Sequence, residues 1–339
     1  MRAWSVLVLA LTMVAGCDRT RPVERAPTPS RPLPQKVLAR DESPWKSRES
    51  CLAMLEAQQH LPRATGKVRV GSWNIRTFPD GDKTDVPWLA CAIALMDGPL
   101  LAVQEIKSNP PARKAALRLI SLLNRHTGGD WKLDLEQCGD GNVPHVGILF
   151  DAARVTTKNV RAAYALRPTD ERPCGVDLHP GLRASVAFRG GPRFEFVSVH
   201  LPSGPGKDHA TLRRHSWRGL DLLGNPAVVA GDFNTSGCDG CDSPVTPEQE
   251  VIDLTGALQH ADLLRVPSTL NCSEYFDRKP WLLDHVAVSD SLRPLVRGRA
   301  QVAGYCAELT CQQASGFAAA HRHLSDHCPV VLELATAAE

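Results

Sequence analysis

The sequence has few aromatic residues, almost no excess charge and no long apolar run beyond its N-terminus. Only 5% of its 339 residues are Phe, Trp or Tyr, and its formal net charge is +2. A charge this close to neutral does not favour a polyanionic partner over any other class. After residue 16, no apolar run approaches the roughly 20 residues that a membrane-spanning helix needs. These absences leave a large α/β domain as the expected class of protein.

The N-terminal residues have the pattern of an export signal. Arg2 precedes the run AWSVLVLALTMVAGC, which is too short to cross a bilayer and ends in small residues. Its end, Val14 to Cys17, resembles the lipobox of bacterial lipoproteins. The resemblance implies that residues 1–16 are a signal peptide, that Cys17 is lipidated, and that the protein lies in the bacterial cell envelope, periplasmic or at the outer surface. Five prolines and many charges then predict an extended tether over residues 17–41.

The remaining cysteines favour disulfides over a zinc site. The chain has 11 cysteines, so ten remain when Cys17 is set aside. An even number in an exported chain is typical of a disulfide framework, whose pairing the residues alone do not define. Cys238 and Cys241 form a CxxC pair, but no second CxxC or HxxxH follows at the spacing of a zinc site.

Apolar periodicity predicts an α/β domain over residues 66–339, preceded by a helical extension at 42–65. Strands are expected at 67–76, 99–105, 131–136, 146–151, 182–188, 193–200, 226–232, 284–289 and 329–334, and helices at 85–96, 109–128 and 208–223. Polar side chains recur where these strands end or begin: Asn74, Glu105, Glu136, His200, Asp232 with Asn234, Asp284, and Asp326 with His327. Open α/β folds place their chemistry at strand ends, so we expect these groups to form one site.

Six motifs resemble, in order, the endonuclease/exonuclease/phosphatase superfamily and, within it, the deoxyribonuclease I branch. They are WNIRTF (73–78), AVQEIK (102–107), VSVHLPSG (197–204), GDFNT (231–235), LLDHVAVS (282–289) and SDHCPV (325–330). The resemblance covers roughly residues 67–335. It implies a four-layer α/β sandwich, in which two mixed β-sheets pack face to face with helices outside, and it implies metal-dependent hydrolysis of phosphodiesters.

The resemblance also implies a metal site. Glu105 matches the principal metal ligand of the superfamily, and Asn74 and Asp326 add oxygen ligands. Hard oxygen donors suit Mg²⁺, which we expect as the cofactor, with Ca²⁺ or Mn²⁺ as alternatives.

Two histidines resemble the pair that flanks the scissile phosphate in the superfamily. We expect His200 to be the general acid and His327 the general base, although the roles could exchange, because imidazole titrates near neutral pH. Glu136 is expected to orient His200, and Asp284 to orient His327. Asp277, in the local sequence YFDR, competes with Asp284 for that role.

The strand end at Asp232 and Asn234 is expected to face the same site. With Phe233 turned into the core, both polar side chains can point to one side. In the superfamily, residues at these two positions contact metal, water and phosphate oxygens.

Further residues are assigned by the same resemblance. Arg76, Lys107 and Arg183 match positions that contact substrate phosphates in the deoxyribonuclease branch. A disulfide of that branch implies a bond between Cys238 or Cys241 and Cys272.

The expected function is that of a monomeric, sequence-tolerant endonuclease acting on nucleic acid, with DNA as the favoured substrate and the lipid anchor as its only membrane contact. The first alternative is a phosphoesterase acting on lipid or on inositol or sugar phosphates, as sphingomyelinases do, although no exposed apolar hairpin is evident in the sequence. A non-catalytic binding module is the second alternative, and it is disfavoured because every expected acid, amide and imidazole is present.

Overall fold

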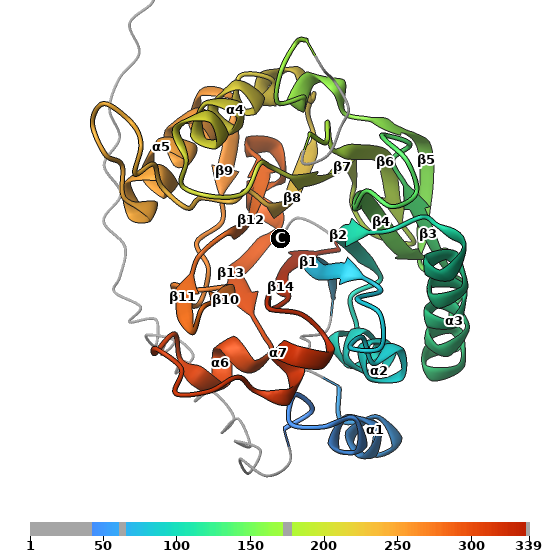
Figure 1. Ribbon diagram of the computed structural model, residues 1–339. Helices are drawn as coiled ribbons and strands as arrows, with labels where there is room; N and C mark the ends of the chain where they lie inside the picture. Colours follow the sequence, from blue (N-terminus) through green and yellow to red (C-terminus); the bar gives the residue numbers. More distant parts are fainter. Residues whose placement is uncertain (1–42, 61–65, 172–177, 337–339) are drawn as a thin grey trace, which may run out of the picture. The chain divides into compact units, whose positions relative to one another are not determined.

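Two six-stranded mixed sheets pack face to face in the computed structural model, which describes residues 43–60, 66–171 and 178–336 (Figure 1). The first sheet has the order β13 (Val296–Val302), β14 (Val330–Ala335), β1 (Lys67–Phe78), β2 (Leu100–Ile106), β4 (His145–Asp151), β3 (Trp131–Leu135). The second has the order β5 (Val155–Ala162), β6 (Leu182–Phe188), β7 (Arg193–His200), β8 (Ala227–Asp232), β12 (Asp284–Ser289), β9 (Leu263–Arg265). The expected fold class is therefore confirmed.

Each sheet contains one parallel pair near its middle, and this arrangement positions the polar strand ends. β1 pairs with β2 in parallel, β7 pairs with β8 in parallel, and the other pairings within the two sheets are antiparallel. Because parallel strands end at the same edge of a sheet, the side chains that follow them meet there. Between the two sheets, Gln104 Nε2 of β2 donates a buried hydrogen bond to Ser198 Oγ of β7 at 3.2 Å.

Helices cover both outer faces of the paired sheets (Figure 1). The helices are α1 (Arg48–Glu56), α2 (Val86–Met96), α3 (Pro110–Thr127), α4 (Lys207–Trp217), α5 (Pro247–His260) and the short α6 (Tyr305–Leu309) and α7 (Ala319–His323). Asp85 and Asn109 cap α2 and α3 by accepting backbone N–H groups, and proline lies in each first turn, as the sequence predicts. The helix expected at 208–223 instead ends at Trp217 and is followed by a 3₁₀ turn at Leu220–Leu222.

Buried apolar side chains on the outer face of the second sheet pack against α4 and α5. Val197 and Val229 of the sheet form one cluster with Trp217, Leu254 and Leu258 from the helices. A larger cluster fills the space between the two sheets and beneath α2. These layers reproduce the expected sandwich and leave the strand ends as the exposed edge.

Several elements were not predicted from the sequence. They are β5, α5, β9, β13, α6, α7 and the two-stranded hairpin of β10 (Glu274–Phe276) and β11 (Lys279–Trp281). The hairpin strands are only three residues long, which is too short for alternation to be detected.

Four disulfides join described residues, and they correct the expected pairing. Cys238 bonds to Cys241 and Cys272 bonds to Cys311, so the predicted bond between the CxxC pair and Cys272 is wrong. The CxxC pair closes its own turn because Cys238 forms a backbone bridge with Val245, which brings Cys241 back toward it.

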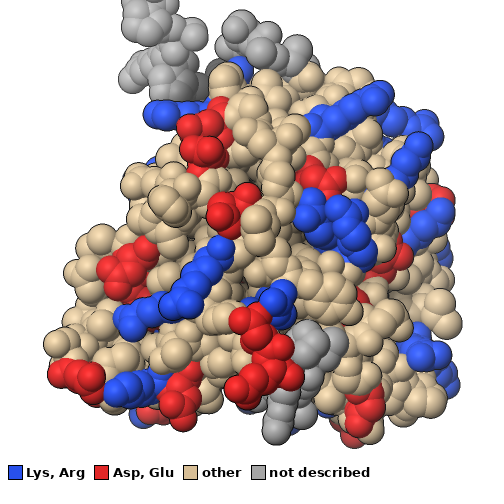
Figure 2. All heavy atoms as spheres, turned by 90° about the horizontal axis from the view of Figure 1, so that it is seen from above, with Lys and Arg blue, Asp and Glu red and all other residues tan. Residues whose placement is uncertain are grey.

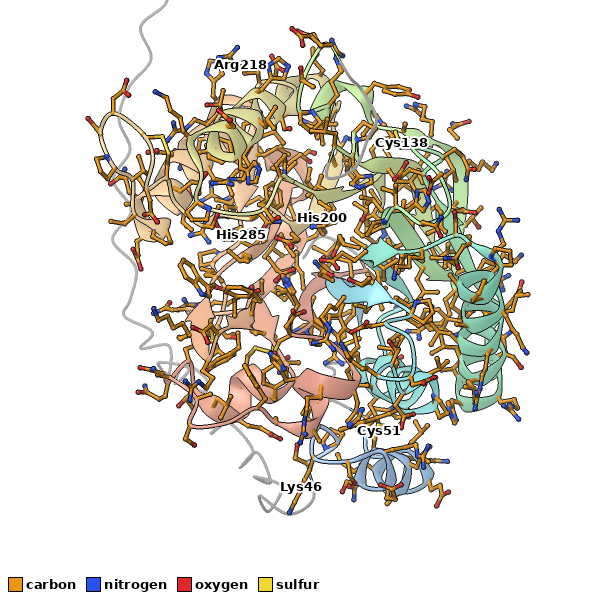
Figure 3. All side chains as sticks on the ribbon, in the orientation of Figure 1. Lys46, Cys51, Cys138, His200, Arg218 and His285 are labelled. Carbon is orange, nitrogen blue, oxygen red and sulfur yellow. A yellow bond between two sulfur atoms is a disulfide. The ribbon has the colours of Figure 1, made fainter. Side chains whose placement is uncertain are left out.

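The other two disulfides and one further bonded cysteine complete the framework. Cys51–Cys91 joins α1 to α2, Cys306–Cys328 joins α6 to the approach of β14, and Cys138 is also disulfide-bonded. Figure 3 shows Cys51 on the inner side of α1. The described part of the helical extension is thus covalently tied to the domain.

The predictions for the signal peptide, the lipidated Cys17 and the tether lie outside the described residues. Among residues 43–60, 66–171 and 178–336, no helix has the length and apolar character needed to cross a bilayer.

Candidate active site

The ends of β1, β2, β7 and β8 bring acidic, amide and imidazole groups together at one edge of the two sheets. The Asn74 side-chain amide donates to Glu105 Oε1 at 2.9 Å and to Asp232 Oδ2 at 3.1 Å, so it bridges the two sheets. His200, which ends β7, lies at this meeting point in Figure 3. The strand-end side chains therefore form one cluster.

Two imidazoles flank a single carboxylate oxygen in this cluster. Oδ2 of Asp232 lies 3.6 Å from Nε2 of His200 and 3.6 Å from Nε2 of His327. Burial raises the pKa of Asp232 to about 6; Asp284 adds to this rise, while His327 and His200 oppose it. The pair of histidines predicted from separate motifs thus converges on one carboxylate oxygen.

Asp284 is the carboxylate that orients His327. Its Oδ2 accepts a hydrogen bond from His327 Nδ1 at 2.8 Å, and both groups are buried. Burial alone would lower the pKa of His327, but Asp284 and Asp232 together raise it well above its usual value. Asp277 lies exposed in the turn of the β10–β11 hairpin, so the pairing with Asp284 is confirmed over its competitor.

Glu136 does not orient His200, which corrects the sequence prediction. Its Oε1 accepts from Nδ1 of His179 at 2.8 Å and from Nδ1 of His145 at 3.2 Å. The ring of His179 stacks on that of His200, with centroids 6.3 Å apart and planes 5° apart. The carboxylate is therefore one imidazole removed from His200, because His179 lies between them.

The hydrogen bonds of Glu136 also control its ionisation. Burial would raise its pKa, but the bonds from His145 and His179 lower it to about 2. Glu136 is consequently an anion across the physiological range.

Phe233 has the expected orientation, and the predicted role of the Asn234 side chain stays a prediction. Phe233 is 1% exposed and packs in the cluster beneath α4 and α5. The Asn234 backbone N–H donates to Asp232 Oδ1 at 2.9 Å, and its side-chain amide donates to Leu201 O. Asn234 and Glu105 adopt positive φ angles of 51° and 64°, a strained backbone that concentrates at functional sites.

The cluster has the chemistry of a site for a hard divalent cation. Within the described residues, ligand atoms of Asp232, Asp284 and His327 lie within 4.8 Å of one another. Asp284 Oδ1 is buried and has no hydrogen-bond partner among residues 43–60, 66–171 and 178–336, as expected of an oxygen that binds a cation or an ordered water.

The three residues predicted as metal ligands have different surroundings. The Asn74 side chain uses its amide toward Glu105, while its Oδ1 accepts from the Arg76 backbone N–H. Both Glu105 oxygens face the cluster and accept hydrogen bonds, Oε1 from Asn74 and Oε2 from Thr77. The Asp326 carboxylate accepts from Ser325 Oγ at 3.3 Å, and no direct contact joins it to Glu105 in the described part of the chain. The metal roles of these three residues stay predictions.

The three predicted phosphate-binding cations are not equivalent. Arg183 lies outside the cluster: it donates to Glu195 and to Leu223 O, because the alternation of β6 turns its side chain toward the outer face of the second sheet. Arg76 donates to the carbonyls of His321 and Arg322 in α7, and its Nε has no partner among the described residues. The half-buried Lys107 side chain forms no ion pair within the described residues, so its ammonium is the available cation.

Several supporting residues were missed in the sequence. Ser273 Oγ accepts the backbone N–H groups of Leu283 and Asp284, and Ser325 Oγ accepts that of His327 while donating to Asn74 O. A buried carboxylic side chain, Glu274, also faces the cluster. Ser325 lies within a recognised motif, whereas nothing in the local pattern distinguishes Ser273 or Glu274.

Charged groups of both signs are mixed on the surface. Figure 2 shows Lys and Arg side chains lying among Asp and Glu side chains on the face it presents. This mixture agrees with the near-neutral net charge.

Comparison with known proteins identifies the fold. No family model matches the sequence, and no curated protein matches it. Among solved structures, D. rerio TDP2 complexed with single-strand DNA product has 16% identity and a TM-score of 0.54, covering 79% of this chain and 98% of that one. The 3′ phosphatase NExo from Neisseria, bound to product DNA hairpin, has 16% identity and a TM-score of 0.53, covering 79% and 99%.

A third structure carries the family's own designation. An endonuclease/exonuclease/phosphatase family protein from Bacteroides thetaiotaomicron has 18% identity and a TM-score of 0.50, covering 79% of this chain and 97% of that one. The chain thus has the endonuclease/exonuclease/phosphatase fold.

Proposed function

We propose that this protein is a metal-dependent phosphodiester hydrolase that cleaves nucleic acid, most favourably DNA, with little sequence preference. The observation that carries the proposal is the convergence of His200 and His327 on Asp232, each imidazole 3.6 Å from the same oxygen. This arrangement provides an acid and a base on either side of a group that a phosphate can approach. The structural neighbours bound to DNA products support nucleic acid as the substrate class.

The protein's own groups have separate tasks in this proposal. His327, held by Asp284, takes a proton from the attacking water, and His200 gives a proton to the leaving oxygen. Asp232 and Asn234 orient water and phosphate between them. A divalent cation, most favourably Mg²⁺, would be held by Glu105 with Asn74 and Asp326, and it would neutralise charge on the phosphate when bound.

We further propose that the enzyme is a monomer exported to the bacterial cell envelope and anchored through lipidated Cys17. The tether after Cys17 then holds the domain away from the lipid surface. Mass determination of the membrane-extracted protein, before and after a Cys17→Ser change, tests the lipid directly. A mature N-terminus elsewhere than residue 17 contradicts the anchor.

The nuclease proposal is tested by nicking of supercoiled plasmid. The soluble domain from about residue 36 is assayed with Mg²⁺, with Ca²⁺ or Mn²⁺, and with EDTA, beside His200→Ala and His327→Ala. His260→Ala is the matched control, because His260 is exposed at the end of α5. Metal-dependent nicking that both site variants lose and the control keeps supports the proposal; intact plasmid under every metal contradicts it.

One observation favours the alternative of a lipid or small phosphoester substrate. Phe276 at the hairpin of β10 and β11 is 66% exposed, so an apolar side chain projects beside the site where the sequence had shown no such hairpin. Sphingomyelin vesicles and inositol phosphates are therefore included in the same assay. Phosphate or headgroup release from these substrates without plasmid nicking would favour this alternative.

A further inference from the structure

Glu274 is a buried carboxylic side chain at the site with no assigned task. It lies on β10, is 7% exposed, and accepts no hydrogen bond from the residues that the structure describes. Its carboxyl group faces His327, whose Nε2 lies 4.0 Å from Glu274 Oε1. The Glu274 side chain is 9% exposed, so its carboxyl group has little contact with bulk solvent but can hold a bound water molecule.

Backbone hydrogen bonds fix the position of Glu274 relative to His327 and Asp284. Residues 273–275 run beside residues 326–328: Cys328 N donates to Ser273 O at 2.7 Å, Tyr275 N donates to Asp326 O at 3.0 Å, and Glu274 forms a bridge with His327. Ser273 Oγ meanwhile accepts the N–H of Asp284. One short ladder therefore sets the relative positions of Glu274, His327 and Asp284.

Two disulfides at one end of this ladder restrain both of its segments. Cys272, directly before Ser273, bonds to Cys311, and Cys328, directly after His327, bonds to Cys306. A side chain carried by such a rigid pair of segments suits the orientation of a small reactant.

The 4.0 Å distance between Glu274 Oε1 and His327 Nε2 matches the space needed for one bridging oxygen atom. It is too long for a direct hydrogen bond, but a single oxygen atom can lie about 2.8 Å from both atoms. Nδ1 of His327 is already used by Asp284, so Nε2 is the nitrogen that faces a reactant. Asp232 Oδ2 lies 3.6 Å from the same nitrogen.

We propose that Glu274 binds the attacking water together with His327 and fixes its direction of attack. This proposal rests on the proposed function and adds a residue to it. His327 Nε2 removes one proton of the water, the water oxygen forms the new bond to phosphorus, and the bond from phosphorus to the leaving oxygen breaks. His200 gives its proton to that leaving oxygen. Glu274 holds a hydrogen bond to the water throughout and transfers no proton.

Binding the attacking water requires the length of the Glu274 side chain rather than its charge. Burial raises the pKa of Glu274 to about 8, with Asp326, Asp232 and Asp284 adding to the rise and His327 opposing it. Either protonation state offers the water a hydrogen bond, as donor or as acceptor. Gln preserves the length and both kinds of hydrogen bond, whereas Asp preserves the charge but is shorter by about 1.5 Å, one C–C bond.

Three substitutions separate these properties: Glu274→Gln, Glu274→Asp and Glu274→Ala. We expect Glu274→Gln to retain kcat within a few-fold, and Glu274→Asp and Glu274→Ala to lose about 10²-fold, as a displaced reactant does. KM should change little, because the water rather than the phosphodiester loses its partner. Asp277→Asn is the matched control on the same hairpin, since Asp277 is exposed and Asn also tolerates its positive φ of 46°.

The assay measures kcat and KM on plasmid or a fluorescent oligonucleotide, and thermal unfolding confirms that each variant is folded. A wild-type protein that turns over no phosphodiester overturns the proposed function and this proposal with it. If the wild type is active, full activity in folded Glu274→Ala overturns the role of Glu274 alone. Activity retained by Glu274→Asp and lost by Glu274→Gln likewise overturns it, because charge would then be the required property.

Discussion

The two histidines of the site are positioned in different ways, and this difference bears on the two catalytic tasks proposed for them. His327 is held at its ring by Asp284 at 2.8 Å, at its N–H by Ser325 and at its carbonyl by Trp73. The His200 ring has no hydrogen-bond partner among the described residues; its nearest carboxylate oxygens lie 3.6 and 3.9 Å away.

His200 depends instead on packing against a second imidazole. Its side chain is 13% exposed against 6% for His327. Its ring is nearly parallel to that of His179, with centroids 6.3 Å apart, and Glu136 anchors His179. A base must hold one tautomer, which a carboxylate enforces. An acid that follows a departing oxygen needs less restraint.

The largest expected effect comes from removing either imidazole. His327→Ala should lower kcat by about 10⁴-fold and His200→Ala by about 10²- to 10³-fold, within the range of general acid–base catalysis. The smaller loss at His200 follows because water can replace a loosely held acid. Single-turnover cleavage rates with Mg²⁺ measure both. Equal losses would remove the distinction between the two residues.

The next largest effect should distinguish a carboxylate that bonds directly to a site histidine from one that acts through a second imidazole. Asp284→Asn should lower kcat by about 10²-fold or more, because it alters the direct partner of His327. Glu136→Gln should cost only about tenfold, because it acts on His200 through His179. Both rates are measured on the same oligonucleotide. A larger loss of kcat in Glu136→Gln than in Asp284→Asn would contradict the distinction between direct and indirect orientation.

Disulfide removal should affect the His327 side of the site more than the loop beyond Asn234. Changing Cys306 and Cys328 together to Ser should lower the free energy of unfolding by about 3 kcal/mol, and changing Cys238 and Cys241 by about 2 kcal/mol, since the shorter loop restrains the unfolded chain less. Only the first change adjoins His327, so only it should also reduce kcat. Urea unfolding and the cleavage assay test both statements.

The smallest expected effect is a pH dependence of stability. The pKa of Glu136 is lowered from 4.5 to about 2 by folding. Its contribution to stability is therefore present above pH 4.5 and lost as the pH falls toward 2. Glu136→Gln should lack this part of the acid-induced loss. Urea midpoints measured between about pH 2 and 6 test it, and parallel curves for the two proteins would contradict the assignment.

Local patterns in the sequence predicted the central strands and two helix starts, whereas the sandwich fold and the roles of the site residues were implied by the resemblance. Alternating and continuous apolar runs predicted the central strands, and Asp85 and Asn109 predicted two helix starts. The short hairpin of β10 and β11 carries too few residues for any such pattern. Glu274 was missed for that reason, since its importance comes from a bridge to a residue 53 positions away (327 minus 274).

The sequence alone determined which chemical groups gather at the strand ends, because strand length and chain order place them at one edge of each sheet. Only the tertiary structure decided which of those groups touch. Glu136 reaches His179 and not His200, Arg183 turns toward Glu195, and Cys272 pairs with Cys311. A hydrogen bond requires its two atoms to lie about 3 Å apart. Whether they do depends on side-chain direction and loop path, which are determined by the packing of segments far apart in the chain.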